Sequence, residues 1–280
     1  MSKYHKLNME IHFLNVGCGT MVLILFPDNS IFMYDCNITN DNEDDVISYL
    51  DKVIDPLTEI DVFINSHRDA DHLRGIKTLH AEHPIKKIWD TGEPGTTTTS
   101  DDYQNYMDLR RSIPSKIIYP RKFWEYGGAV LRCMNSIWGD YDDPNDQSVV
   151  LKIEYNGSAA MLAGDTSFKP WKEKILTYYS KSKIQSDILL ASHHGSLSFF
   201  DDPSDKEYYY TEHIKAIKPQ MTIFSVGPNS NDLPNSKAVE LYENNSTGSK
   251  QGNKGYSTEE KGNMKLTLKE DGGWSLSVKQ

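Results

Sequence analysis

A group of metal-binding side chains directly after a short apolar run constrains the fold more than any other feature of the sequence. His67, Asp69, Asp71 and His72 fall within six positions, next to the apolar run at 60–64. Because side chains alternate along an extended backbone, His67, Asp69 and Asp71 are expected to point to one side. A helix N-cap would explain one aspartate but neither histidine. The pattern therefore predicts a ligand cluster at the carboxyl end of a buried strand.

Two later apolar runs end on residues of the same kind. The stretch "MLAGD" ends at Asp165, and "LLASHHGS" carries His193 and His194. Taken alone, a strand-end aspartate is typical of a turn, and adjacent histidines also occur at strand ends without a function. Together with the first group, however, three strand ends carry potential ligands. We therefore expect the three segments to meet at one metal site.

Strands and helices alternate along the whole chain of 280 residues. Short apolar runs between turn residues predict buried strands, the first of them at 10–16, 21–26, 30–36 and 60–65. Apolar residues at helical spacing predict helices over 40–54, 73–83 and 236–244, whereas 244–262 is a polar run. No repeat or composition break marks a boundary. The sequence thus predicts a single domain over residues 1–280, of the α/β (α+β) class, with two packed sheets and outer helices.

The charge and cysteine content narrow the class of protein. Forty acidic against thirty basic residues give a net charge of -10, which argues against a general basic surface for nucleic acid, although a bound metal can supply local positive charge. Cys18, Cys36 and Cys133 are scattered and predict no disulfide framework. The longest apolar run, at 21–26, is too short to span a bilayer. We expect a cytoplasmic protein that does not associate with membranes.

The motifs in chain order resemble a known family. The series "HFLNVGCGT", "MYDCN", "SHRDADHLRG", "NDQSVVL", "MLAGD" and "SHHGS" is similar to the metallo-β-lactamase fold superfamily. Within it, the order of motifs resembles the soluble domain of ComEC-type DNA-uptake proteins and their stand-alone relatives. The resemblance implies the αβ/βα four-layer sandwich, in which two mixed β-sheets are flanked by helices.

The resemblance also implies a role for each site residue. The metal ligands would be His67, Asp69, Asp71, His72, Asp165 and His193. Either His193 or His194 is the late ligand; if His193 binds metal, His194 is free to act as the catalytic acid beside Asp71. Asp35 would support the metal loop from behind. In this chain Asp69 stands where the superfamily motif has a histidine, and residues 145–148 replace a further ligand histidine.

Such a ligand set implies two divalent ions, manganese or zinc, that lower the pKa of a water molecule. The leading hypothesis is a metal-dependent hydrolase, a phosphodiesterase or nuclease, whose substrate phosphate is oriented by Asn145 and Ser196. The phosphodiester could be nucleic acid or a nucleotide, and a protein partner is not predicted. Alternatives are hydrolysis of an ester, thioester or lactam, or a non-catalytic regulatory protein that retains the fold. The segments 90–103 and 197–210 are expected to frame the mouth of the site.

Overall fold

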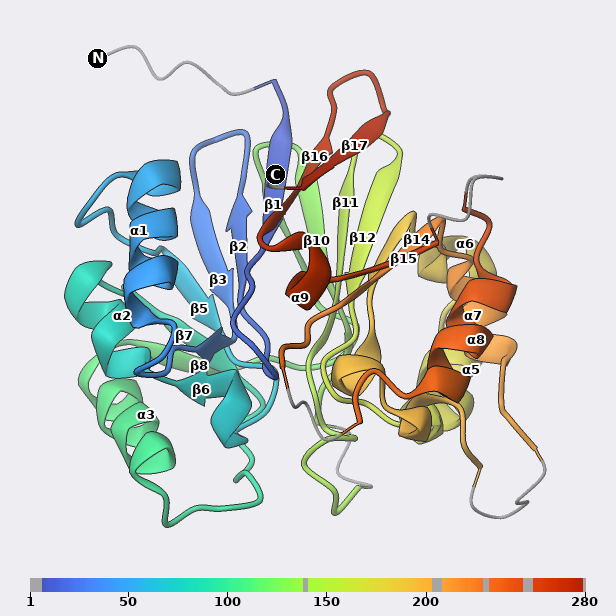
Figure 1. The fold of residues 1–280 in the computed structure, drawn as a ribbon, viewed down its shortest axis with the longest axis horizontal. Helices are drawn as coiled ribbons and strands as arrows, with labels where there is room; N and C mark the ends of the chain where they lie inside the picture. The colour runs from blue at the N-terminus through green and yellow to red at the C-terminus, as the bar shows by residue number, and fades with distance from the viewer. Residues whose placement is uncertain (1–6, 138–140, 203–207, 229–231, 249–253, 279–280) are drawn as a thin grey trace.

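Two mixed β-sheets face each other and carry helices on their outer sides (Figure 1). The computed structural model describes residues 7–137, 141–202, 208–228, 232–248 and 254–278, and all counts below refer to these. The first sheet has eight strands in the order β17 (Trp274–Val278), β16 (Met264–Leu268), β1 (Met9–Phe13), β2 (Val22–Leu25), β3 (Ile31–Tyr34), β5 (Val62–Ile64), β7 (Ile88–Asp90) and β8 (Ser115–Ile117). The second has seven, in the order β15 (Gly255–Ser257), β14 (Met221–Phe224), β13 (Ile188–Leu190), β12 (Ser158–Leu162), β11 (Val150–Tyr155), β10 (Ala129–Asn135) and β9 (Phe123–Tyr126). This is the expected four-layer α/β sandwich, which is confirmed.

The helices form the two outer layers (Figure 1). Beside the first sheet lie α1 (Glu43–Ile54), α2 (Ile76–Glu82) and α3 (Asp101–Ser112). Beside the second lie α4 (Phe168–Pro170), a π-helical turn (Trp171–Ile175), α5 (Leu176–Tyr178), α6 (Lys181–Ile184), α7 (Glu212–Ile217) and α8 (Ser236–Asn245). The short helix α9 (Thr258–Lys261) precedes β16. Helix α1 shows why such segments fold: Val46, Leu50 and Ile54 recur at helical spacing and are buried against the sheet.

The main core lies between the two sheets. Along β11, Leu151 and Ile153 belong to this core together with residues of the first sheet, while Lys152 and Glu154 alternate to the opposite face. A second and a third apolar cluster pack the helices onto the outer face of each sheet. Strands β2 and β13, unlike β11, have apolar residues in clusters on both faces, so each reads as an apolar run.

The parallel strands of both sheets deliver the candidate ligands to one edge. Strands β3, β5, β7 and β8 are parallel neighbours in the first sheet, as are β12, β13, β14 and β15 in the second. Parallel strands have their carboxyl ends at the same edge, where α/β proteins commonly bind ligands. The chain leaves β5 toward His67, β12 toward Asp165 and β13 toward His193.

The structure departs from the sequence expectation in two short segments. The helix expected over 73–83 begins only at Ile76, because Gly75 adopts a left-handed φ of 73° and Leu73–Arg74 pairs as β6 with β4 (Cys36–Asn37). The polar run 244–262 contains strand β15, which its composition did not indicate, and residues 249–253 lie outside the described part. At the C-terminal end of the described part, β16 and β17 form an antiparallel hairpin. In the described part of the chain, no helix is long and apolar enough to cross a membrane.

Truncating a residue between the sheets tests this packing. Ile153 is fully buried, so Ile153→Ala is expected to lower the free energy of unfolding by about 2–5 kcal/mol, since it leaves a cavity. Ile117→Ala, at a side chain that is 40% exposed, is the matched control and should cost less than about 1 kcal/mol. Urea unfolding of both variants measures the difference. Equal losses would contradict the proposed layer arrangement.

Candidate functional site

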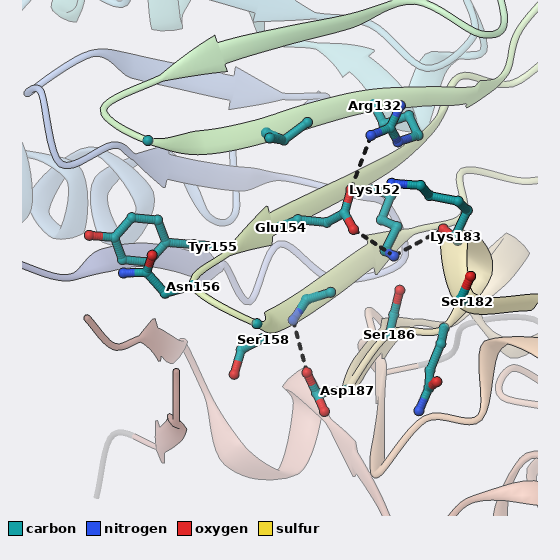
Figure 2. A pocket seen from close by; sticks show the side chains of 15 residues that line it. Arg132, Lys152, Glu154, Tyr155, Asn156, Ser158, Ser182, Lys183, Ser186 and Asp187 are labelled. Carbon is teal, nitrogen blue, oxygen red and sulfur yellow. Dashed lines mark hydrogen bonds and ion pairs between the residues drawn. The ribbon is translucent and has the colours of Figure 1, made fainter. Parts of the chain in front are cut away.

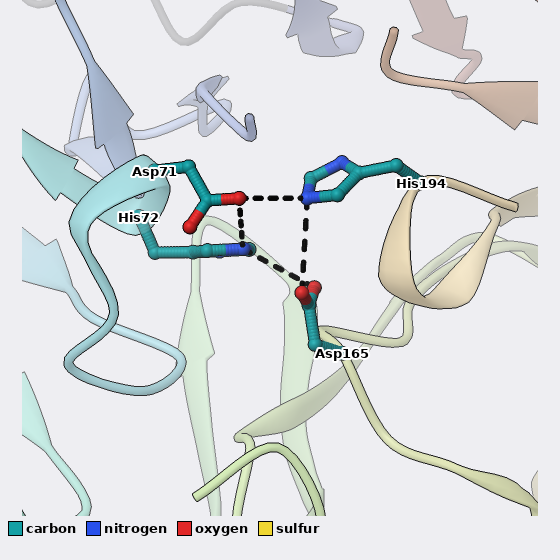
Figure 3. A group of neighbouring side chains, drawn as sticks. All are labelled: Asp71, His72, Asp165 and His194. Carbon is teal, nitrogen blue, oxygen red and sulfur yellow. Dashed lines mark ion pairs between the residues drawn. The ribbon is translucent and has the colours of Figure 1, made fainter. Parts of the chain in front are cut away.

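Four ligand-type side chains from three segments converge at the carboxyl edge of the sheets. Asp71, His72, Asp165 and His194 each offer a ligand atom, and these atoms lie within 4.8 Å of one another. Figure 3 shows the four side chains pointing toward a common point. We call this group the Asp165 cluster. It includes one residue from each of the two later motifs and two from the first.

Asp165 is the member around which the others are arranged. Its Oδ1 lies 3.2 Å from Nε2 of His72, and its Oδ2 lies 3.7 Å from Nε2 of His194. Nε2 of His67 lies 4.0 Å from the same Oδ2. Asp71 closes the ring, with Oδ2 at 3.3 Å from Nε2 of His194 (Figure 3). One buried carboxylate therefore faces the Nε2 atoms of three buried histidines.

The ring of His72 is held from behind by a buried aspartate. Nδ1 of His72 donates to Oδ2 of Asp35 at 2.7 Å, which directs Nε2 toward Asp165. The Asp35 carboxylate also accepts from the backbone N–H and the hydroxyl of Ser66. Asp35 thus occupies the supporting position that the resemblance implied.

The other two histidines are oriented in the same way. Nδ1 of His194 donates to the carbonyl of Ser225 at 3.0 Å, and Nδ1 of His67 contacts the hydroxyls of Ser66 and Ser148. Nε2 of His67, His72 and His194 is buried in each case, and it has no hydrogen-bond partner among the described residues. A buried nitrogen without a partner is costly, and a metal ion coordinates imidazole through such an atom. The donor set therefore fits a divalent cation.

The charges around the cluster favour a cation as well. Burial lowers the pKa of His72, but the carboxylates of Asp165 and Asp35 outweigh it and raise that pKa well above its usual value. Burial raises the pKa of Asp165, whereas the charges of His72 and His194 hold it well below its usual range. Burial raises the pKa of Asp71, but the charges of His72 and His194 outweigh it and hold that pKa well below its usual value. Either a proton on His72 or a bound metal ion would compensate the negative charge of the surrounding carboxylates.

Asp69 lies beside this cluster and is held by a separate loop. The backbone N–H and the hydroxyl of Thr96 each donate to one of its carboxylate oxygens. Its Oδ2 is 3.8 Å from Nε2 of His67. Gly95 packs so closely against the carbonyl of Arg68 that a Cβ there would clash. Nothing in the threonine run at 96–99 singles out Thr96, so sequence reasoning missed this contact.

The two adjacent histidines are placed differently. His194 is 2% exposed and belongs to the cluster, whereas the His193 side chain is 33% exposed with Nε2 at 3.8 Å from Asp165 Oδ2. Both have left-handed φ angles, of 48° and 55°, in a conformation that non-glycine residues rarely adopt. Strained backbone of this kind concentrates at functional sites. The implied ligand set named His193 while leaving open which of the two binds metal; the geometry places His194 in the cluster and His193 at its edge.

The two residues expected to contact substrate have no direct bond to the cluster. The Ser196 hydroxyl accepts from the backbone N–H of Ser198, and the backbone of Asn145 forms a turn with Asp143 and Ser148. Among the described residues, no hydrogen bond joins either side chain to the Asp165 cluster. Ser148, which the sequence did not single out, instead accepts from the backbone N–H of Asp165 and contacts His67.

A separate cavity of about 430 Å³ lies at the opposite end of the second sheet (Figure 2). It is lined by residues near the turn that joins β11 to β12, and by Asp187 just before β13. Its wall carries the cations Arg132, Lys152 and Lys183 against the carboxylates of Glu154 and Asp187. Glu154 lies 3.0 Å from the Lys152 ammonium and 3.5 Å from Arg132. The cavity is therefore remote from the Asp165 cluster and largely balanced in charge.

The turn before Asp165 offers a stability test of the site. Gly164 has φ 56°, and a Cβ there would lie 2.6 Å from the Cβ of Ser148. Gly164→Ala is expected to cost about 2–4 kcal/mol, because backbone strain and a steric clash combine. Gly157→Ala has open space around it and should cost only the strain, about 1–2 kcal/mol. Urea unfolding compares the two; the close fit at Ser148 is refuted if Gly157→Ala proves the more damaging.

Comparison with known proteins agrees with the fold and the order of motifs. The family model of the metallo-β-lactamase superfamily matches residues 15–201. ComE operon protein 3 of Bacillus subtilis (strain 168) is 21% identical to the chain over 192 residues, which are 68% of this chain and 23% of that protein. The chain thus spans less than a quarter of this relative.

Solved structures share the fold over most of the chain. YhfI, a metallo-β-lactamase fold protein from Bacillus subtilis, superimposes with a TM-score of 0.52 at 13% identity, covering 96% of this chain and 100% of that one. A diphosphatase of the PhnP family gives 0.52 at 13% identity, covering 94% and 99%. CmlA, a diiron β-hydroxylase from Streptomyces venezuelae, gives 0.56 at 11% identity, covering 94% and 54%. The likeness to ComE operon protein 3 fits the ComEC-like group, and the family match shows that the chain belongs to the metallo-β-lactamase superfamily.

Proposed function

We propose that the chain is a metal-dependent phosphodiesterase that hydrolyses its substrate at the Asp165 cluster. The observation that carries the proposal is the convergence of three buried, unpartnered imidazole Nε2 atoms on one buried carboxylate. The superfamily consists mostly of metal-dependent hydrolases, which supports hydrolysis as the reaction type.

Two features support a phosphodiester as the substrate. Carboxylates contribute three of the nearby ligand groups, Asp69, Asp71 and Asp165, and an oxygen-rich set favours manganese and phosphoryl chemistry over an all-nitrogen zinc site. The structural likeness to a diphosphatase of the PhnP family supports a phosphate-containing substrate.

The ligands would form two sets that share Asp165. Asp71, His72 and His194 would hold one ion together with Asp165, and this set has four protein ligands. His67 and Asp69 would hold the second ion, again with Asp165. His193 lies at the rim, near Asp165 but more exposed, where it can meet a substrate. These assignments exchange the roles that the sequence favoured for His193 and His194.

The residues of the chain have defined tasks in this scheme. Bound divalent ions supply Lewis-acid stabilisation of phosphoryl oxygens and lower the pKa of a water molecule. Asp35 and Ser225 fix the imidazoles of His72 and His194, so that no reorganisation is needed when substrate binds. The exposed edge of His193 can donate a proton to the departing alcohol oxygen.

Metal content distinguishes the two histidines. His194→Ala is expected to lower manganese affinity at least about 10-fold, because it removes an inner ligand. His193→Ala, the matched neighbour, should retain the metal content of the parent. Asp165→Asn should weaken both ions together, since both sets share this carboxylate. Titration of the metal-free protein with manganese, followed by elemental analysis, measures these effects; loss of metal in His193→Ala alone would reverse the assignment.

Activity is tested on a generic substrate. The manganese-loaded protein is expected to hydrolyse bis(p-nitrophenyl) phosphate, and Asp71→Asn should lower kcat by about 10²–10⁴-fold. Asp44→Asn, at an exposed acid in the first turn of α1, serves as control and should keep the activity.

Two outcomes would replace the proposal. Hydrolysis of an ester, thioester or lactam without any phosphodiester cleavage would assign a different substrate class to the same site. Metal binding without hydrolysis of any of them would indicate a regulatory protein that retains the fold.

A further inference from the structure

Five segments surround the Asp165 cluster, and we call them the mouth loops. They are 91–100, 141–149, 166–173, 192–202, and 225–235 without the undescribed residues 229–231. Each begins or ends next to a strand whose carboxyl end reaches the cluster, or contacts a cluster residue directly. Of the two segments expected to frame the mouth, 90–103 contacts Asp69 through Thr96 and 197–210 contacts His193 through Ser198. Residues 203–207 of the second segment lie outside the described part.

Direct bonds place these loops against the site. Thr96 of the first loop donates to Asp69, and Ser148 of the second accepts from the N–H of Asp165. Ser225 of the last loop accepts from His194. The loop 192–202 carries the histidines themselves, and the Ser198 hydroxyl lies 3.5 Å from Nδ1 of His193.

The mouth loops are strongly acidic. Their described acidic residues are Glu93, Asp142, Asp143, Asp146, Glu173, Asp201, Asp202 and Asp232. Their only described lysines or arginines are Lys169 and Lys172, and the Lys172 ammonium lies 2.9 Å from Asp202. The rim of the site is thus negative, in a chain whose net charge is already -10.

A hollow beside the cluster offers space for one organic group of the substrate. It measures about 560 Å³ and is lined by Phe168 and by Ser198 next to His193. Its charged lining residues are Asp146, Glu173, Asp201 and Asp202 against Lys169 and Lys172, so that the acidic side chains are in excess. Ser167, which also lines it, is two residues after Asp165. The hollow therefore lies beside His193, and its walls combine an aromatic ring with an excess of negative over positive side chains.

A rim of this charge is unfavourable for binding a polynucleotide strand. A strand carries a phosphate on every nucleotide, and proteins that bind it use lysine and arginine to neutralise several of them. Ions held at the cluster act on the reacting phosphate, whereas the flanking phosphates would lie over the acidic loops. Repulsion between exposed charges extends over about 8 Å at physiological salt, so the exposed acidic side chains of the rim would act on phosphates that lie over them.

We propose that the substrate is a small diester with a single phosphate, whose organic group in the hollow is uncharged or cationic, rather than a nucleic acid strand. This inference rests on the proposed phosphodiesterase activity and narrows its substrate class. The reaction adds water across one P–O bond: the hydroxyl goes to phosphorus, and the proton goes to the departing alcohol. The products are a phosphomonoester and an alcohol.

A charge-reversal experiment tests the inference. The manganese-loaded parent is expected to have a kcat/KM for bis(p-nitrophenyl) phosphate at least about 10-fold above that for a single-stranded oligothymidylate, at physiological salt. The double variant Glu93→Lys/Asp142→Lys reverses two rim charges that make no described side-chain bond. The double variant should raise kcat/KM for the oligonucleotide about 10-fold. Its kcat/KM for the small diester should stay within about 2-fold of the parent value. Adding salt should diminish the gain, because the added attraction is screened.

A remote charge reversal provides the control. Glu82 is exposed at the end of α2, which leads into the amino end of β7 and thus lies away from the mouth. Glu82→Lys should leave kcat/KM unchanged for both the small diester and the oligonucleotide. Fluorescence anisotropy with a labelled oligonucleotide adds a readout that does not depend on turnover, and the parent is expected to bind it more weakly than the double variant.

The outcomes separate this inference from the proposed function. A parent that prefers the oligonucleotide retains the phosphodiesterase activity but overturns the small-diester assignment. If kcat/KM for the oligonucleotide is the same in the double variant as in the parent, the small-diester assignment is also overturned, because the rim charge would then have no effect. A parent that cleaves neither substrate removes the proposed function and the assignment with it.

Discussion

The buried carboxylate of Asp35 is the anchor on which the arrangement of the site depends. It follows strand β3, where its own N–H donates to the carbonyl of Ile64 on the neighbouring strand. Its oxygens accept from Ser66 and from His72, at the two ends of the segment that bears the first ligands. Because the carboxylate is fully buried, water does not compete for these bonds. The shape of the ligand segment is therefore set before any metal binds.

The second sheet supplies the remaining ligands of the site. Asp165 and His194 come from β12 and β13, and they meet the first ligands only because the two sheets pack with their carboxyl edges together. Ser148 joins the halves, since its hydroxyl contacts His67 and accepts from the N–H of Asp165. A small residue at 164 is required where these segments approach each other. Packing between the sheets thus controls the distance between the two sets of ligands.

The charge of the molecule is divided between the cluster and its surroundings. In the cluster, the carboxylates around His72 stabilise a positive charge, which either a proton or a metal ion can supply. Outside, the acidic mouth loops would repel extended polyanions but would have little effect on a substrate with one phosphate. The two regions act on different parts of a substrate. The cluster would set the reaction, and the rim would set the size and charge of what reaches it.

The sequence by itself determined the fold class and the chemical character of the site. Alternating apolar runs and helices predicted two sheets with outer helices, and the ligand types after three strands predicted where a metal could bind. It did not determine which of His193 and His194 faces inward, because that choice depends on two consecutive left-handed residues held by contacts from β14 and the Gly164 turn. Nor did it indicate Thr96, whose neighbours are chemically identical, or the acidic rim, whose members are spread from residue 93 to residue 232. Local pattern fixes which groups are available; only the tertiary packing of distant segments decides which of them touch.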